Sequence, residues 1–246
     1  MKNIIELKNG IKLGYSSDLE KWRADTFFSK EPETLAWIDS FDKNTVFYDV
    51  GSNIGGYSIY AAYKHKNIKV FSFEPVNVNF EIIKRNIFIN RLTNIFPFQI
   101  GISDKTKLTN IYLSDIREGN SGAQLDNPIN EHGEKFEALD VQKTICMSLD
   151  SLTNRYEFPI PNYLKIDVDG LEKEIISGGS NLLKSQSLKS ILIELNTENE
   201  HKDILSDILE AGFIEDAKFN NMENHSSVRR SKDKNNIAKN IVFSRN

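Results

Sequence analysis

The sequence predicts an α/β protein built on a doubly wound, mostly parallel sheet. Short apolar stretches rich in β-branched and aromatic residues alternate with helical patterns over residues 45–100, and this alternation resumes at residue 163. A glycine-rich turn at 49–56 joins the first of these stretches to a helix. Alternation of this kind implies right-handed βαβ crossovers, with helices covering both faces of the sheet.

Composition narrows the class of protein. Apolar residues at 39% and charged residues at 27% are ordinary for a globular chain, and 246 residues suffice for one sizeable core with additions or for two small domains. A net charge of −4 argues against nucleic-acid binding, which depends on clustered Lys and Arg. The single Cys146 excludes an internal disulfide. Because we find no signal peptide and no apolar run of membrane-spanning length, we expect a cytoplasmic protein.

Residues 1–44 are expected to form a small cap on the main domain, 45–246. Asn9-Gly10 between two short apolar-rich arms is the strongest short-range signal for a β-hairpin. Residues 18–30 show no clean period, and a helix is expected over 34–41 after Pro32.

The main domain contains the alternating elements and one interruption. The alternation of strands and helices stops over residues 101–162. Strands are expected there at 107–113 and 141–149, and the long polar segment between them should contact the substrate. The last two strands, 213–219 and 240–244, are expected to form an antiparallel hairpin around a basic segment. The other expected strands are 46–50, 68–73, 95–100, 163–168 and 190–195, and the helices are 56–65, 77–91, 171–177 and 203–211.

The glycine turn after residue 50 predicts a ligand site. A dinucleotide-binding fold requires the pattern G-x-G-x-x-G. In this chain Asn53 occupies the position of the second glycine, which disfavours a pyrophosphate ligand. Asp49 at the head of the turn would repel phosphate and suit the amino group of an amino-acid moiety. Gly51, Asn53 and Gly55 would then form the floor of a site for S-adenosylmethionine, which is adenosine joined to an amino acid.

Glu74 supports this hypothesis from the next strand. It follows that strand directly, where a carboxylate can accept hydrogen bonds from both ribose hydroxyls. The alternative is that Asp49 and Glu74 are loop carboxylates at strand ends with no ligand.

Asp167 and Asp169 are the candidate catalytic carboxylates. They follow the strand at 163–168, at the sheet edge where ligands of open α/β folds bind. Asp167 is the predicted general base for a hydroxyl acceptor, and with Asp169 it could hold Mg²⁺. The alternative is that Asp169 only makes the turn. His132, in the long polar segment, is a second candidate base, and no histidine pair has metal-ligand spacing.

With these motifs in order, the chain resembles the FkbM family of S-adenosylmethionine-dependent methyltransferases. The resemblance covers about residues 31–196. It rests on the motifs Asp49-Val-Gly-Ser-Asn-Ile-Gly, Phe73-Glu-Pro, Gly101-Ile-Ser-Asp, Ser148-Leu-Asp and Lys165-Ile-Asp-Val-Asp-Gly with Glu172.

The resemblance implies a Rossmann-like class I sheet of seven strands that ends in the antiparallel hairpin. It also implies cofactor contacts from Asp49, Gly51, Asn53 and Glu74, with Ser103 and Asp104 near the adenine, and acceptor hydroxyls on sugars or polyketides, often in surface polysaccharide synthesis. The chain departs from the family at Ser52, usually Ala, and at Asp169, usually Glu.

We therefore expect an O-methyltransferase with a small-molecule or glycan acceptor that lies under the 101–162 insertion. An anionic acceptor could meet the basic segment at 220–239. Three alternatives stay open: N-methylation of an amino sugar, which needs no strong base; a catalytically silent cofactor-binding protein, which the change at Asp169 favours; and, least supported, a dinucleotide oxidoreductase.

Overall fold

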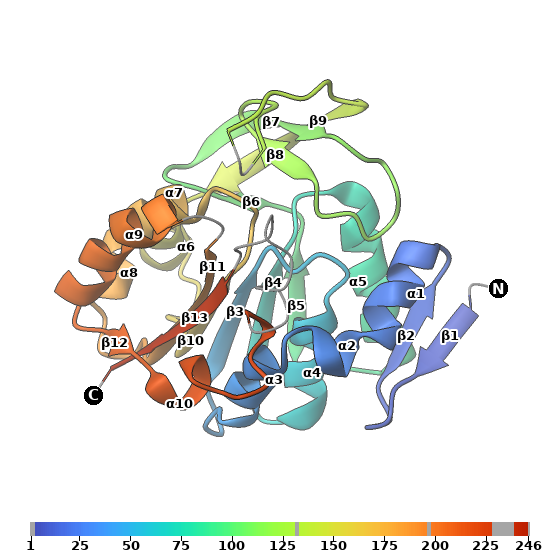
Figure 1. Ribbon diagram of the computed structural model, residues 1–246, viewed down its shortest axis with the longest axis horizontal. Coiled ribbons are helices and arrows are strands. Elements are labelled where there is room, and N and C mark those ends of the chain that lie inside the picture. The colour runs from blue at the N-terminus through green and yellow to red at the C-terminus, as the bar shows by residue number, and fades with distance from the viewer. Residues whose placement is uncertain (1–2, 131–132, 196–197, 228–238, 246) are drawn as a thin grey trace.

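The protein contains a seven-stranded sheet in the order β12-β13-β11-β10-β3-β4-β5 (Figure 1). The computed structural model describes residues 3–130, 133–195, 198–227 and 239–245. Every neighbouring pair in the sheet is parallel except those made by β13, which runs antiparallel to β11 and β12. The strands are β3 (Val46–Val50), β4 (Lys69–Phe73), β5 (Ile95–Phe98), β10 (Tyr163–Ile166), β11 (Ser190–Leu195), β12 (Ile214–Glu215) and β13 (Lys239–Ser244).

The strand order reverses between β3 and β10. From β3 the chain adds β4 and β5 on one side, and it later adds β10 and β11 on the other. In open α/β sheets such a switch point leaves a crevice outside the carboxyl ends of the strands, where ligands bind. The predicted doubly wound sheet is confirmed, and its switch point locates the site.

Helices cover both faces of the sheet, each over its own apolar cluster. Alternate residues of β3 point to opposite faces, so Phe47 joins one cluster and Tyr48 the other. The first cluster includes residues of α4 (Gly56–Lys64), and α5 (Asn77–Ile89) packs Ile87 against it. The second includes residues of α6 (Leu149–Asn154), α7 (Glu172–Ser177), α8 (Ser180–Leu183) and α9 (Glu198–Glu210).

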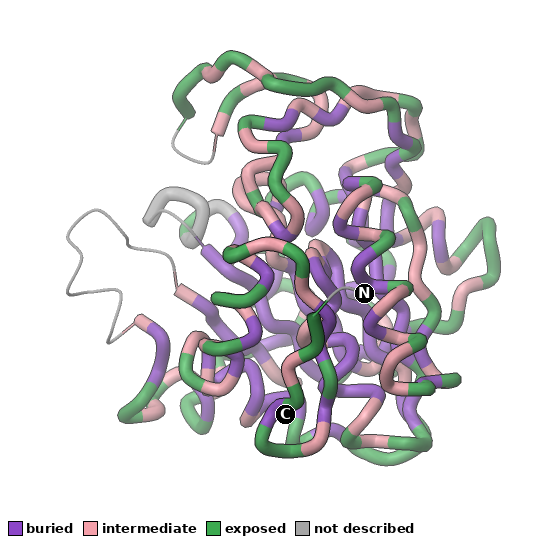
Figure 2. The backbone as a smooth tube through the Cα atoms, turned by 90° about the vertical axis from the view of Figure 1, so that its right-hand side faces the viewer, coloured by how far each residue is buried: buried purple, intermediate pink, exposed green. Residues whose placement is uncertain are grey.

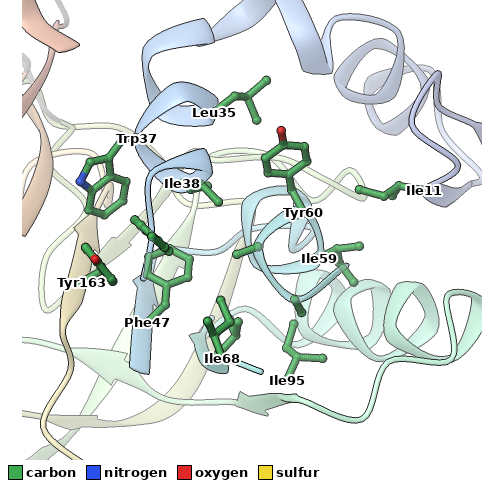
Figure 3. Close-up of a cluster of buried hydrophobic side chains, with 14 of the residues drawn as sticks. Ile11, Leu35, Trp37, Ile38, Phe47, Ile59, Tyr60, Ile68, Ile95 and Tyr163 are labelled. Carbon is green, nitrogen blue, oxygen red and sulfur yellow. The ribbon is translucent and has the colours of Figure 1, made fainter. Parts of the chain in front are cut away.

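The N-terminal segment shares the first of these clusters. Trp37 and Ile38 of α3 (Pro32–Asp39) pack near Phe47 and Tyr163 of the sheet (Figure 3). The indole Nε1 of Trp37 donates to Ser190 Oγ at 2.9 Å. The expected hairpin is confirmed as β1 (Asn3–Glu6) and β2 (Lys12–Tyr15). The segment is therefore held by the same core as the sheet.

Two further helices occupy the region in which the sequence showed no clean period. They are α1 (Asp18–Asp25) and α2 (Phe27–Lys30). Helix α1 begins with a capping box, in which Ser17 accepts from the Glu20 amide and the Glu20 side chain accepts from the Ser17 amide. The S-x-x-E spacing was the available signal for this helix.

The insertion forms a second, four-stranded sheet in the order β6-β9-β7-β8. It lies above the main sheet in Figure 1, and its chain is mostly exposed or half-buried, in contrast to the buried strands below it (Figure 2). The two expected strands are confirmed, and the polar segment between them adds a third. The strands are β6 (Gly101–Ile102), β7 (Lys107–Leu113), β8 (Ala123–Leu125) and β9 (Asp140–Met147).

The strand expected at 213–219 is wrong in extent. Only Ile214–Glu215 forms β12, which pairs with β13 as expected. The Asp216 side chain then accepts a hydrogen bond from the Lys218 amide and starts helix α10 (Ala217–Asn220). An Asp in this capping position favours a helix start over a longer strand. Within the described residues, no helix combines the length and apolarity needed to cross a bilayer.

Candidate active site

A pocket of about 240 Å³ lies at the carboxyl ends of β3, β4 and β10. Its floor comes from the turns after these strands, and further walls come from α1, α2 and the insertion. The polar and glycine residues of the lining include Gly51, Asn53, Glu74, Asp167 and Asp169 from the strand ends, Arg23 and Lys30 from the N-terminal helices, and Asn120 from the insertion.

The glycine turn depends on backbone conformations with positive φ. Gly51 has φ +76°, and a Cβ at this position would stand 1.9 Å from the carbonyl oxygen of Asp167. Glycine is therefore required for β3 and β10 to approach each other here. Asn53 follows with φ +50°, a conformation that Asn tolerates better than most residues.

Gly55, expected in the floor of the ligand site, lies at the start of a helix. It is the N-cap of α4 with φ +79°, and it does not line the pocket. A Cβ on Gly55 would meet Ile83 of α5 at 3.1 Å. Its small size therefore allows close helix packing, and the cofactor contact expected at Gly55 stays a prediction.

Glu74 is a buried carboxylate on the pocket wall, 5% exposed. Its two oxygens accept hydrogen bonds from the backbone amides of Val76, at 2.9 Å, and of Asn53, at 2.8 Å. Burial raises the pKa of Glu74 to about 7 against the opposing effect of these amides. Each carboxylate oxygen can accept a further hydrogen bond, so Glu74 can receive two hydroxyl groups from a ligand in the pocket.

Asp49 lies behind the turn and does not line the pocket. Its side chain is fully buried under α4, where Oδ2 accepts a hydrogen bond of 2.6 Å from Ser58 Oγ. Lys165 Nζ lies 3.7 Å from Oδ1. Strand alternation places this side chain on the α4 side of the sheet, and its contact with the cofactor's amino group stays a prediction.

Asp167 faces the pocket and is paired with a buried lysine that received no role in the sequence analysis. Lys165 is 1% exposed, and its Nζ lies 2.6 Å from Asp167 Oδ2. Burial alone would raise the pKa of Asp167, but the charges of Lys165 and Lys30 hold it well below its usual value. Asp167 is thus an ionised hydrogen-bond acceptor at neutral pH.

Two further carboxylates gather around Asp167. One oxygen each from Asp167, Asp169 and Glu194 lie within 4.8 Å of one another. Asp169 has φ +58°, and its carbonyl oxygen accepts a hydrogen bond from Gln124 of β8 at 2.8 Å, which ties the insertion to the site. Oxygen donors of this kind suit Mg²⁺, but an acidic cluster by itself does not identify a metal site, and we assign none.

Ser103 and Asp104 are not in the pocket wall. Ser103 is buried, and its carbonyl oxygen is so close to Gly178 that a Cβ there would stand at 2.4 Å. Asp104 faces Lys105 and Lys107 at 3.6 Å. The preceding residues Ile100, Gly101 and Ile102 line the pocket, and the adenine contacts of Ser103 and Asp104 stay predictions.

His132 lies outside the described residues, as do Arg229 and Arg230 of the basic segment. The site residues that sequence reasoning missed come from α1, α2 and the insertion, which fold back over the crevice from far along the chain. Lys165 could have been noticed as a charged residue within an apolar strand.

Comparisons with known proteins agree with this geometry. Residues 49–215 match the family described as the methyltransferase FkbM domain. The chain is 28% identical to the hexuronic acid methyltransferase AglP of Haloferax volcanii over 87% of its length and 82% of the relative's. It is 26% identical to the methyltransferase sdnD of Sordaria araneosa, over 57% of this chain and 62% of that one.

Solved structures show the same fold. The FkbM methyltransferase of Methylobacillus flagellatus superposes with a TM-score of 0.52 at 12% identity, over 93% of this chain and 55% of that one. The Trm5b protein of Pyrococcus abyssi gives a TM-score of 0.51 at 13% identity, over 99% and 55%. The family match spans most of the sheet and the strand ends that form the pocket. The chain therefore belongs to the FkbM family of methyltransferases.

Proposed function

We propose that the protein is an S-adenosylmethionine-dependent O-methyltransferase whose acceptor is a hydroxyl of a sugar or glycan, with a uronic acid unit as the first candidate. Family membership supports methyl transfer. The similarity to a hexuronic acid methyltransferase runs through most of both chains and supports the acceptor class.

Glu74 is the observation that carries the choice of cofactor. A buried carboxylate with two spare acceptor positions suits the pair of hydroxyls on an unphosphorylated ribose. Gly51 lines the pocket, and the lack of a Cβ lets the turn lie directly against the Asp167 carbonyl. Ile100 and Ile102 offer an apolar wall for the adenine. These residues fit the adenosine half of the cofactor.

The cofactor, when bound, supplies an electrophilic methyl group on a sulfonium centre. Asp167, kept ionised by Lys165, would accept a hydrogen bond from the acceptor hydroxyl and orient its oxygen toward that centre. A carboxylate with a lowered pKa is a weak proton acceptor, so its part is mainly positioning, and the hydroxyl proton would pass to solvent water. Asn120 and Ala123 of the insertion line the pocket, and the Asn53 side chain of the turn donates to the Asn120 carbonyl at 2.9 Å. The insertion therefore closes over the turn, which supports it as the acceptor-binding part.

A methyl-transfer assay on a panel of acceptors tests the proposal. Purified protein would be incubated with the cofactor and with glucuronate-containing glycans, neutral hexosides or amino sugars, and the products analysed by mass spectrometry. We expect a mass increase of one methylene unit on a uronic acid or neutral sugar. A methyl group on the nitrogen of an amino sugar alone, with Asp167→Asn still active, would instead support N-methylation. No product with any acceptor would favour a catalytically silent protein.

We also propose that the enzyme acts in the cytoplasm in surface polysaccharide synthesis. Cys146 is buried as a free thiol, as is usual for proteins in a reducing compartment. Fractionation of cells that express the protein, followed by detection with an antibody, would test the compartment.

A further inference from the structure

A second cavity, of about 60 Å³, adjoins the main pocket beside the glycine turn. It lies between that turn and the N-terminal helices α1 and α2. The two cavities share five lining residues, namely Arg23, Lys30, Gly51, Asn53 and Asp167. A ligand in the main pocket can therefore extend a group past Gly51 into the smaller space.

The charged groups in the wall of this second cavity are mostly cationic. Arg23, Lys30 and Lys165 contribute positive charge, and Asp167 contributes the opposing carboxylate. Lys165 already pairs with Asp167 at 2.6 Å, and Lys30 Nζ lies 2.7 Å from Glu31 Oε1. The charges of both lysines are therefore balanced within the protein.

The positive charge of Arg23 is balanced less completely by nearby carboxylates than the charges of the two lysines. Its Nε donates to the carbonyl oxygen of Gly119 at 2.7 Å, which fixes the guanidinium between α1 and the insertion. That partner is neutral, and among the described residues no carboxylate oxygen lies within 4.0 Å of the guanidinium. The Arg23 charge acts at longer range on Glu74 in the main pocket, where it works to lower the pKa of the carboxyl group. A half-buried arginine in this situation keeps a planar pair of donors for an anion, and carboxylates fit that pair in a bidentate manner.

We propose that the second cavity is a carboxylate-binding site in which Arg23, assisted by Lys30, receives the carboxylate of a bound ligand. The proposal rests on the function proposed above, which offers two sources: the amino-acid end of the cofactor and the acid group of a uronic acid acceptor. Because Gly51 and Asn53 line both cavities, the amino-acid end of a cofactor whose ribose meets Glu74 can reach the second one.

The two side chains proposed to hold the carboxylate lie outside the part of the chain that matches the family. The family match begins at residue 49, whereas Arg23 and Lys30 belong to α1 and α2. The N-terminal helices would therefore complete the ligand site in addition to packing on the sheet.

Isothermal titration of the full chain with three probes tests the proposal. S-adenosylhomocysteine carries the amino-acid carboxylate, 5′-methylthioadenosine lacks it, and glucuronate carries the acceptor's carboxylate. The variants are Arg23→Gln and Arg23→Lys. Lys21→Gln is the matched control, since Lys21 is an exposed cation on the same helix that pairs with Asp25.

If the carboxylate comes from the cofactor, Arg23→Gln should weaken S-adenosylhomocysteine binding by about 10- to 100-fold, the usual effect of losing hydrogen bonds to a charged group. Arg23→Lys should lose less, and Lys21→Gln nothing. Binding of 5′-methylthioadenosine should be unchanged in all variants, which also shows that they fold. If the carboxylate comes from the acceptor, Arg23→Gln should spare S-adenosylhomocysteine and abolish glucuronate binding to the protein saturated with it.

The proposal is overturned if Arg23→Gln binds S-adenosylhomocysteine as the wild type does and no glucuronate binding depends on Arg23. In that case the proposed cofactor stands. Failure of the wild type to bind either adenosine compound would overturn both this inference and the proposed function.

Discussion

Replacing Glu74 by glutamine is the most informative perturbation of the cofactor site. The substitution keeps the shape of the side chain and removes the charge that would accept two ribose hydroxyls. Hydrogen bonds to charged groups contribute about 1.5–3 kcal/mol each. A net loss of about 3 kcal/mol at pH 8 corresponds to roughly 100-fold weaker binding of S-adenosylhomocysteine.

The raised pKa of Glu74 predicts that the affinity for S-adenosylhomocysteine falls as the pH is lowered. Because the pKa is about 7, most of the wild type is ionised at pH 8 and most is protonated at pH 6. If only the ionised form binds, affinity should fall about tenfold from pH 8 to pH 6, in proportion to the ionised fraction. Glu74→Gln has no such proton, so its affinity should stay nearly constant.

The same pKa affects stability in the absence of ligand. The folded pKa lies above the ordinary value of 4.5, so the folded protein retains a proton that the unfolded chain releases. The contribution of Glu74 to stability is therefore fully present below about pH 4.5 and is lost as pH rises to about 7. Urea unfolding of the two proteins from pH 5 to pH 8 should show this loss only in the wild type.

Isothermal titration at pH 6, 7 and 8 is the assay for affinity. Glu81→Gln is the matched control, because Glu81 lies on the exposed side of α5, where it pairs with Lys84. It should bind as the wild type does. A wild-type affinity that does not change with pH, together with an unaffected Glu74→Gln, would refute the assignment of Glu74 to the ribose.

Two further predictions compare pairs of substitutions. Gly51→Ala should destabilise the fold far more than Gly133→Ala, since both sites have positive φ but only Gly51 has a backbone oxygen 1.9 Å from the new Cβ. Thermal melting should show a small drop in Tm for Gly133→Ala, from the backbone strain alone, and a much larger one for Gly51→Ala. Equal shifts would contradict the close approach of β10. Lys165→Met should cost about 3–5 kcal/mol of unfolding free energy at pH 7, against at most about 1 kcal/mol for Lys189→Met. In both lysines Nζ lies 2.6 Å from an aspartate oxygen, but the side chain of Lys165 is 1% exposed and that of Lys189 is 49% exposed. Equal losses of unfolding free energy in urea titrations would therefore argue against a buried pair.

The local chemistry of the chain was enough to predict most of the sheet. Alternating apolar strands and helical stripes identified the parallel strands, and the Asn9-Gly10 hairpin formed as expected. Helix α1 was missed because its apolar residues have no helical period, although Ser17 and Glu20 provide a capping box. The strand at 213–219 was overextended because Asp216 acts as a helix cap.

The site was predictable where a residue's direction follows from its place after a strand. Glu74 and Asp167 lie on the pocket wall as expected. Asp49 lies outside the pocket wall, because the period of two puts it on the same face as Phe47, which belongs to the first apolar cluster. Arg23 and Lys30 could not be found from local sequence, because only the tertiary fold brings α1 and α2 to the crevice.

A crystal structure of the protein with S-adenosylhomocysteine would test the central claim most directly. We predict ribose hydroxyl oxygens within hydrogen-bond distance, about 3 Å, of the Glu74 carboxylate, with the sulfur facing Asp167 across Gly51. A ligand bound elsewhere, or one whose ribose turns away from Glu74, would contradict the account.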